Sequence, residues 1–186
     1  MALIGAGSSS ASGLMATGGL TSQPIGHFQF CQASPDDCNV RPRDRGPLQA
    51  SSAMWDKIHK INLAVNKAVK PMEDYAVYGK EEVWAYPIDG VGDCEDYVLE
   101  KRRQLQAAGI SFSNLLITVV RKPDGEGHAV LTVRTDNGDY ILDNLNDEAK
   151  LWSHTGYMFL KRQASNHTGR WVSLRDENNL LVGSVN

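Results

Sequence analysis

Three apolar segments separated by short polar turns constrain the fold of this chain more than any other feature. They span residues 113–121, 128–134 and 140–143, and each has the length and the β-branched content of a strand. A polar loop at 122–127 joins the first two, and the turn signal Asp136-Asn137-Gly138-Asp139 joins the last two. The segments therefore predict an antiparallel sheet.

The part of the chain before these segments is predicted to be helical. Residues 51–70 carry apolar side chains at helical spacing, with Ser52 as the expected cap and Pro71 as the stop. Further strand is expected within 152–161 and at 171–172. A helix-rich half followed by an antiparallel sheet predicts the α+β class.

A second amphipathic helix holds the most reactive side chain of the sequence. It is expected over residues 93–108, after the breaker Gly92, with Gly109 as its stop and residues 100–104 as its polar face. Cys94 then lies in the first turn, where free backbone N–H groups and the helix dipole favour a thiolate. Because the thiolate is the reactive form of cysteine, Cys94 is the candidate nucleophile.

Acidic residues surround this cysteine and oppose its ionisation. Asp93, the expected N-cap, precedes Cys94, and Glu95 and Asp96 follow it. Negative neighbours raise the pKa of a thiol, so a nearby histidine or a bound cation is needed if Cys94 is to react.

Composition limits the classes of function. The 186 residues carry a net charge of −3, which argues against general nucleic-acid binding or a basic membrane-surface patch. No apolar run approaches the roughly 20 residues of a membrane-spanning helix. We expect one domain over residues 25–175, a flexible segment at 1–24 and a tail at 176–186.

The cysteines and the N-terminal segment bear on the cellular compartment. Cys31 and Cys38 lie on either side of a polar loop and are expected to form a disulfide in an exported protein; in a cytosolic protein they would be two free thiols. A zinc site is disfavoured because no second ligand pair lies nearby. Residues 1–24 resemble the end of a processed export signal without a basic region, with plain disorder as the alternative.

A cysteine nucleophile needs a base and a group that orients the base. His128 begins the second strand and Asp143 ends the third, so Cys94, His128 and Asp143 form a candidate triad. A two-residue turn at Asn137-Gly138 would instead place His128 opposite Asp147, with Asp143 about 13 Å away along the sheet. Asp147 is therefore the alternative acid, unless the turn is longer or bulged.

Three motifs in the sequence are similar to those of the bacterial transglutaminase-like cysteine proteinases. They are Gly92-Asp93-Cys94-Glu95-Asp96-Tyr97, Gly127-His128-Ala129-Val130-Leu131 and Tyr140-Ile141-Leu142-Asp143-Asn144. The resemblance implies a papain-like fold with Cys94 as nucleophile, His128 as base and Asp143 as the orienting acid. It also implies Ca²⁺ dependence, with Asp93, Glu95 and Asp96 as ligands.

The same resemblance implies a periplasmic endopeptidase that cleaves a protein substrate such as a large surface adhesin, and an inner-membrane receptor that sequesters the enzyme. Two other interpretations stay open. A transglutaminase-type acyl-transferase would use the same three residues, with an amine in place of water. A calcium-binding or partner-binding module would keep them without catalysis.

Overall fold

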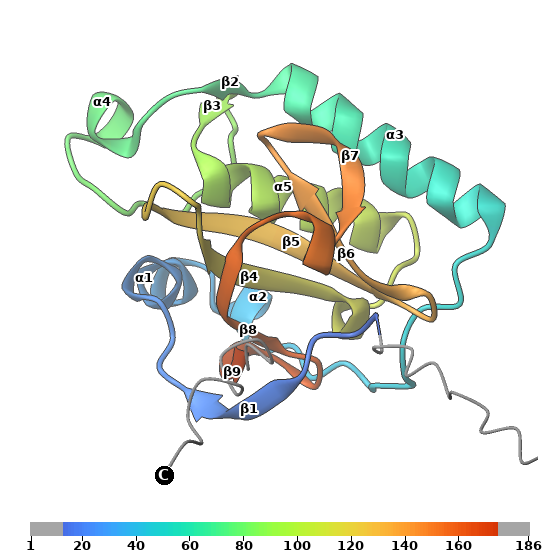
Figure 1. Ribbon diagram of the computed structural model, residues 1–186. Helices are drawn as coiled ribbons and strands as arrows, with labels where there is room; N and C mark the ends of the chain where they lie inside the picture. Colours follow the sequence, from blue (N-terminus) through green and yellow to red (C-terminus); the bar gives the residue numbers. More distant parts are fainter. Residues whose placement is uncertain (1–12, 175–186) are drawn as a thin grey trace, which may run out of the picture.

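An antiparallel sheet runs through the centre of the molecule (Figure 1). The computed structural model describes residues 13–174, and within them seven strands pair in the order β1-β9-β8-β4-β5-β6-β7. These strands are β1 Thr17–Thr21, β4 Leu115–Arg121, β5 Gly127–Thr135, β6 Gly138–Asp143, β7 Asn146–Leu151, β8 Met158–Ala164 and β9 His167–Leu174.

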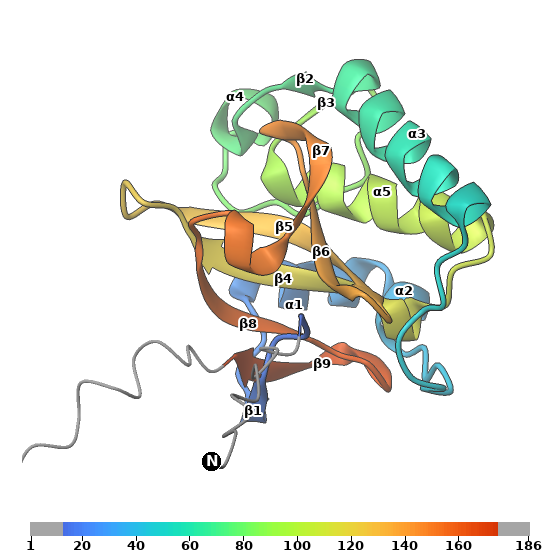
Figure 2. The ribbon, with the colours of Figure 1, turned by 45° about the vertical axis from the view of Figure 1, so that its right-hand side comes forward.

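Helices cover one face of this sheet. They are α1 Ile25–Ala33, α2 Pro35–Cys38, α3 Ser52–Ala68 and α5 Cys94–Ala107, whereas the short helix α4 Asp74–Tyr78 lies apart from the sheet (Figure 1). Short 3-10 turns span Phe112–Asn114 and Trp152–His154, and two-residue strands β2 Lys70–Pro71 and β3 Val91–Gly92 pair in parallel. Helix α5 lies along β5, and α3 packs against both α5 and β7 (Figure 2).

The sheet buries apolar side chains on both faces, because successive residues of a strand point to opposite sides. The face toward the helices carries the larger cluster, which includes Phe30, Ile58, Trp84, Val98, Leu99, Leu105, Leu115, Ile117, Leu131, Val133, Leu142 and Trp171. The opposite face carries Met15, Val120, Val130, Ile141 and Phe159. Packing on the larger cluster fixes α5, which begins at Cys94, against β5, which carries His128.

The predicted α+β class is confirmed, and two details of the helix boundaries differ. Ser51, not Ser52, occupies the N-cap of α3, and its hydroxyl accepts a hydrogen bond from the Met54 N–H at 3.3 Å. Helix α3 ends at Ala68, ahead of the expected stop, and Pro71 lies in β2.

The predicted polar face of α5 is wrong for two of its five residues. Lys101 and Arg102 are buried, and the Nε of Arg102 donates to the carbonyl of Leu115 at 3.2 Å. Glu100 and Arg103 behave as expected and pair at 2.7 Å. Because α5 lies between the sheet and α3, its buried arc is wider than its hydrophobic pattern predicts.

Two strands that the apolar pattern did not predict lie at the edges of the sheet. Strand β1 falls within the segment expected to be flexible through residue 24, so that expectation is wrong for Thr17–Thr21, which pair with β9. Strand β7 pairs only with β6. Residues 1–12 and the expected tail at 176–186 lie outside the described residues.

A disulfide joins Cys31 to Cys38, with their Cα atoms 5.5 Å apart. The intervening segment is not the expected polar loop: the bond links α1 to the end of α2. Cys94 is a free thiol. Among residues 13–174, no helix combines the length and apolar character needed to cross a membrane.

Candidate active site

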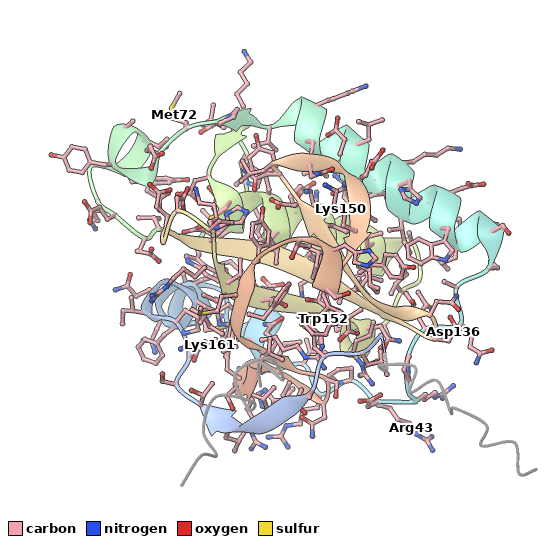
Figure 3. The ribbon with its side chains drawn as sticks, viewed as in Figure 1. Arg43, Met72, Asp136, Lys150, Trp152 and Lys161 are labelled. Atoms are coloured by element: carbon pink, nitrogen blue, oxygen red, sulfur yellow. A yellow bond between two sulfur atoms is a disulfide. The ribbon has the colours of Figure 1, made fainter. Side chains whose placement is uncertain are left out.

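A cleft of about 900 Å³ opens where the start of α5 meets the start of β5. Cys94 and His128 both line it, together with Leu145 from the turn after β6. Met72, which lies beside α4 (Figure 3), lines it as well. Two of the three residues predicted to form a triad therefore share one cleft.

Cys94 is the first residue of α5 and is half-buried. Its thiol donates a hydrogen bond to Glu95 Oε2 at 2.9 Å, and the Ala129 N–H donates to Sγ at 3.4 Å. Burial, followed by the charge of Glu95, raises the pKa of the thiol. The surroundings of Cys94 therefore favour the protonated thiol, as its acidic neighbours in the sequence predict.

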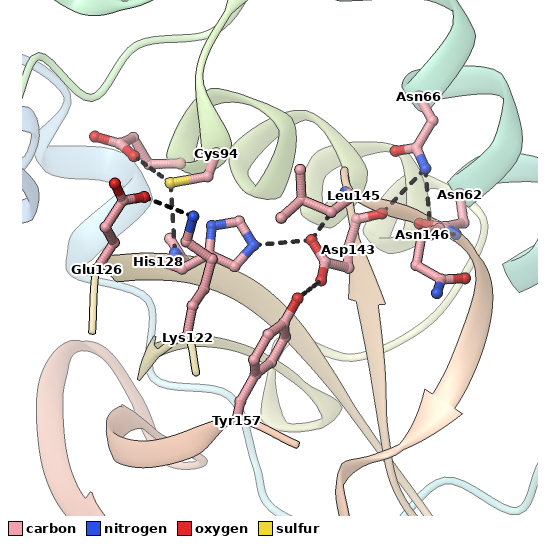
Figure 4. A network of polar contacts seen from close by, with 12 residues as sticks. Asn62, Asn66, Cys94, Lys122, Glu126, His128, Asp143, Leu145, Asn146 and Tyr157 are labelled. Atoms are coloured by element: carbon pink, nitrogen blue, oxygen red, sulfur yellow. Dashed lines mark hydrogen bonds and ion pairs between the residues drawn. The ribbon is translucent and has the colours of Figure 1, made fainter. Parts of the chain in front are cut away.

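His128 lies between Cys94 and Asp143 (Figure 4). Its Nε2 is 2.9 Å from Asp143 Oδ1. The Tyr157 hydroxyl donates to Asp143 Oδ2 at 2.6 Å, and the Leu145 N–H donates to Oδ1 at 3.0 Å. Burial acts to raise the pKa of Asp143, but the hydrogen bonds from His128, Tyr157 and Leu145 outweigh it and hold this pKa below its ordinary value.

The ionised state of Asp143 determines which ring nitrogen of His128 carries the proton. An ionised carboxylate only accepts hydrogen bonds, so the proton between the two side chains lies on His128 Nε2. In the neutral imidazole the other nitrogen, Nδ1, is then the basic one. Among the described residues no hydrogen bond joins the His128 ring to the Cys94 thiol, which is turned toward Glu95.

The pairing of β5 with β6 differs from the expected one, because the turn between the two strands lies one residue earlier in the sequence. Thr135 pairs with Gly138, and Leu131 pairs with Leu142, so Asp136 and Asn137 form the turn. Continuing this register sets Asp143 opposite a residue only two positions from His128. Diagonal neighbours of this kind are about 7–8 Å apart, within reach of an aspartate and a histidine.

Asp147, the alternative acid, faces another element. Its side chain accepts a hydrogen bond from Asn66 Nδ2 of α3 at 2.9 Å. Asp143, and not Asp147, contacts the His128 ring.

Acidic side chains cluster beside the start of α5. Carboxylate oxygens of Asp74, Asp93 and Asp96 lie within 4.8 Å of one another. Burial first, and neighbouring carboxylates next, raise the pKa of Asp93 to about 8 and that of Asp96 to about 7. Asp93 Oδ1 and Asp96 Oδ2 are buried without a hydrogen-bond partner. Such groups are costly unless protonated or paired with a cation.

This cluster differs from the set of ligands expected from the sequence. It contains Asp93 and Asp96 but not Glu95, which instead groups with Asp93 and the Cys94 thiol. Asp74, which local sequence reasoning missed, comes from α4 and also accepts a hydrogen bond from the Val83 N–H. Asp93 occupies the N-cap position of α5 but makes no capping side-chain hydrogen bond, so its predicted role as a cap is wrong.

Gly92 allows this close packing. A Cβ atom at this position would lie 2.5 Å from Asp96 Oδ2. Any larger residue would push the Asp96 carboxylate out of the cluster.

Three solved structures of LapG from Legionella pneumophila have a similar fold. The calcium-bound structure is 22% identical, with a TM-score of 0.56 over 67% of this chain and 71% of that chain. A second LapG structure is 21% identical, with a TM-score of 0.55 over 86% of this chain and 84% of that chain. An EGTA-treated LapG structure is 20% identical, with a TM-score of 0.55 over 86% of each chain. None of the curated proteins searched matches this sequence.

The family comparison covers most of the chain. The model of the bacterial transglutaminase-like cysteine proteinases matches residues 17–179, a span that contains the three sequence motifs, the cleft and every strand described above. The chain belongs to this family of cysteine peptidases.

Proposed function

We propose that this chain is an exported, calcium-dependent cysteine endopeptidase with Cys94 as nucleophile, His128 as general base and Asp143 as the acid that orients His128. The observation that carries the proposal is the 2.9 Å contact of His128 Nε2 with an ionised Asp143, because His128 lines the same cleft as the free Cys94 thiol.

The chemistry follows from the tautomer. His128 Nδ1 takes the proton of the Cys94 thiol, and the thiolate attacks the carbonyl carbon of the scissile peptide bond. The imidazolium then donates its proton to the departing amine. Water, activated by the same imidazole, hydrolyses the thioester and frees Cys94 for another cycle.

Calcium fits the carboxylates beside the thiol. Asp74, Asp93 and Asp96 offer buried oxygens, two of them unpaired, and Ca²⁺ takes 6–8 oxygen ligands. We assign these three residues as ligands, with Glu95, which groups with Asp93 and the Cys94 thiol, as a fourth. Bound Ca²⁺ would supply the positive charge that offsets these carboxylates beside the nucleophile.

The similarity to LapG, together with the Cys31–Cys38 disulfide, supports export to the periplasm and a protein substrate such as a surface adhesin. A receptor in the inner membrane that sequesters the enzyme belongs to the same proposal. The open cleft, rimmed by Met72 and Leu145, is accessible to an extended, flexible segment of a protein.

Alkylation of Cys94 by iodoacetamide, followed by mass spectrometry, tests the triad without a known substrate. The wild-type chain with Ca²⁺ should react faster than the denatured chain, and His128→Ala or excess EGTA should remove this advantage. His154→Ala, at an exposed histidine in the 152–154 turn, is the matched control and should react like wild type. Equal rates for His128→Ala and wild type would refute the triad.

Turnover of casein provides the second measurement. Cys94→Ala should abolish cleavage, and His128→Ala should reduce kcat on the order of 10⁴-fold. Adding an amine donor separates hydrolysis from acyl transfer: amine incorporation without cleavage would identify a transglutaminase in place of a peptidase.

A further inference from the structure

The turn that follows Asp143 is stabilised by side chains from outside the sheet. Strand β6 pairs with β7, but the register of this pairing shifts between Ile141 and Asp143. The turn itself is open to solvent, with Leu145 61% exposed. Strand pairing alone therefore fixes the position of Asp143 poorly.

An asparagine of α3 provides the missing constraint. Asn66 Nδ2 donates to the backbone carbonyl of Asp143 at 3.0 Å, with a longer contact to the Asn146 carbonyl at 3.4 Å (Figure 4). It also donates to the carboxylate of Asp147 at 2.9 Å. One amide group thus joins the residue that contacts His128 to the first residues of β7.

Asn62 provides an internal comparison one helical turn earlier on the same face of α3. Its Nδ2 donates to the carbonyls of Asp147 at 2.8 Å and Asn146 at 3.4 Å, but not to Asp143. Asn62 is fully buried, whereas Asn66 is half-buried. The two side chains are chemically identical and differ in whether they reach Asp143.

Lys101 lies on α5, which packs against β6, the strand that carries Asp143. It is fully buried, and its Nζ has no hydrogen-bond partner among the described residues; the Tyr97 ring centroid lies 5.9 Å away. The charged groups that act on it are Asp143 of β6 and Asp147 of β7. Burial lowers the pKa of Lys101 to about 7, and these two carboxylates oppose that change.

A buried ammonium without a hydrogen bond contributes little to stability. Replacing a buried charge by an apolar side chain of similar size is often neutral or stabilising. Lys101 is buried without a hydrogen-bond partner among residues 13–174, on the helix that packs against β6, and this position points to an electrostatic role beside Asp143.

We propose that Asn66 and Lys101 are positioning residues for Asp143, an inference that rests on the proposed triad. Asn66 fixes the backbone of Asp143 through its carbonyl, and Lys101 offsets the negative charge of the turn from the protein interior. Together they keep the Asp143 carboxylate directed at His128 Nε2, where hydrogen bonds from Tyr157 and Leu145 act on the carboxylate itself.

The test reads the His128–Asp143 contact directly. The ring proton on His128 Nε2 is followed by NMR, because it is observed only when a hydrogen bond protects it from exchange with water. The alkylation rate of Cys94 by iodoacetamide at one pH, and the melting temperature, are measured on the same samples.

Asn66→Ala should abolish the NMR signal of the His128 ring proton and slow alkylation of Cys94 about tenfold, the equivalent of one hydrogen bond. Asn66→Asp, which keeps the size of the side chain but lacks the donor, should have the same effect. Asn62→Ala is the matched control. Because Asn62 is more buried, this variant should lower the melting temperature more than Asn66→Ala does, yet keep the ring proton and an alkylation rate within about twofold of wild type.

Lys101→Met should leave the melting temperature unchanged or higher while it weakens the ring proton signal and slows alkylation. Arg103→Met, which removes a cation that is 59% exposed on the same helix, should change neither.

An unchanged ring proton and rate in Asn66→Ala, or equal losses in Asn62→Ala, would overturn the assignment of Asn66, and an unchanged ring proton in Lys101→Met would overturn that of Lys101. A wild-type rate that does not depend on His128 would refute the proposed function instead.

Discussion

His27 should make the stability of this protein fall in mild acid. It lies in α1 with 1% of its surface exposed, between the rings of Trp84 and Trp171 at centroid distances of 5.2 Å each. Its Nδ1 accepts a hydrogen bond from Trp171 Nε1 at 3.4 Å. Burial, and secondarily the positive charge of Arg102, lower the pKa of His27 from 6.5 to about 3.

The sign and size of the effect follow from proton linkage. Between pH 6.5 and pH 3 the unfolded chain binds a proton at His27 that the native chain does not bind, so the free energy of unfolding falls as the pH falls. The slope approaches about 1.4 kcal/mol per pH unit, and the loss between pH 7 and pH 5 is about 2 kcal/mol. Above pH 6.5 this contribution to stability is fully present.

Other groups act in the opposite direction. The raised pKa values of Asp93 and Asp96 mean that the native chain binds protons there before the unfolded chain does, so their contribution to stability grows as the pH falls. The test is therefore a difference between two proteins at each pH, in which these contributions cancel.

Urea unfolding of wild type and His27→Gln, at several values between pH 7 and pH 4.5, measures this difference. The variant should be less stable at pH 7 because it loses packing, but its stability should fall less steeply toward acid, by about 1 kcal/mol per pH unit or more. The control His59→Gln, at an exposed histidine of α3, should follow the wild-type slope. Parallel curves for wild type and His27→Gln would refute the reasoning.

Three further changes have direct expected outcomes. Asp74→Asn should weaken Ca²⁺ binding in calorimetry by more than the roughly 10–100-fold typical of outer-shell partners, while Asp89→Asn, at an exposed residue before α5, should leave it unchanged. Tyr157→Phe removes a 2.6 Å hydrogen bond to Asp143, the proposed orienting acid, and should slow alkylation of Cys94 about tenfold or more without unfolding the chain. Replacing both Cys31 and Cys38 by serine opens a small loop and should lower the free energy of unfolding by roughly 2–3 kcal/mol in denaturant titrations.

The sequence predicts the class of the fold but not the register that aligns the candidate triad. Both Asp136-Asn137 and Asn137-Gly138 suit a tight turn, so local turn chemistry does not choose between them. The choice comes from contacts distant in sequence: buried Asp139 accepts from the Met15 N–H at 2.9 Å and pairs with Arg162 at 2.7 Å. These contacts hold Asp139 inside β6, where it pairs with Arg134.

The same reason explains why β7 and Asp74 were missed. Strand β7 reads Asn146-Asp147-Glu148-Ala149-Lys150-Leu151, which has no apolar alternation, and part of what holds it is the pair of asparagines on α3. Asp74 joins the carboxylate cluster only after the segment between α4 and α5 folds back on the helix start. Neither contact can be recognised from neighbouring residues in the sequence. Cys94 and His128, in contrast, lie at the starts of a helix and a strand that the apolar pattern predicts.

At the start of α5, ionisation of the Cys94 thiol conflicts with the negative charge of the carboxylates around it. The Cys94 thiol must lose a proton to react, while Asp93 and Glu95 beside it make that loss harder. Protonating the carboxylates would remove the opposition, but at a pH where the thiol is protonated as well. A divalent cation removes it while the carboxylates stay ionised, at a pH where the thiolate can form. The acidic surroundings of Cys94 therefore favour a nucleophile that is active only with its cation bound, and loss of Ca²⁺ should silence the thiol before it unfolds the chain.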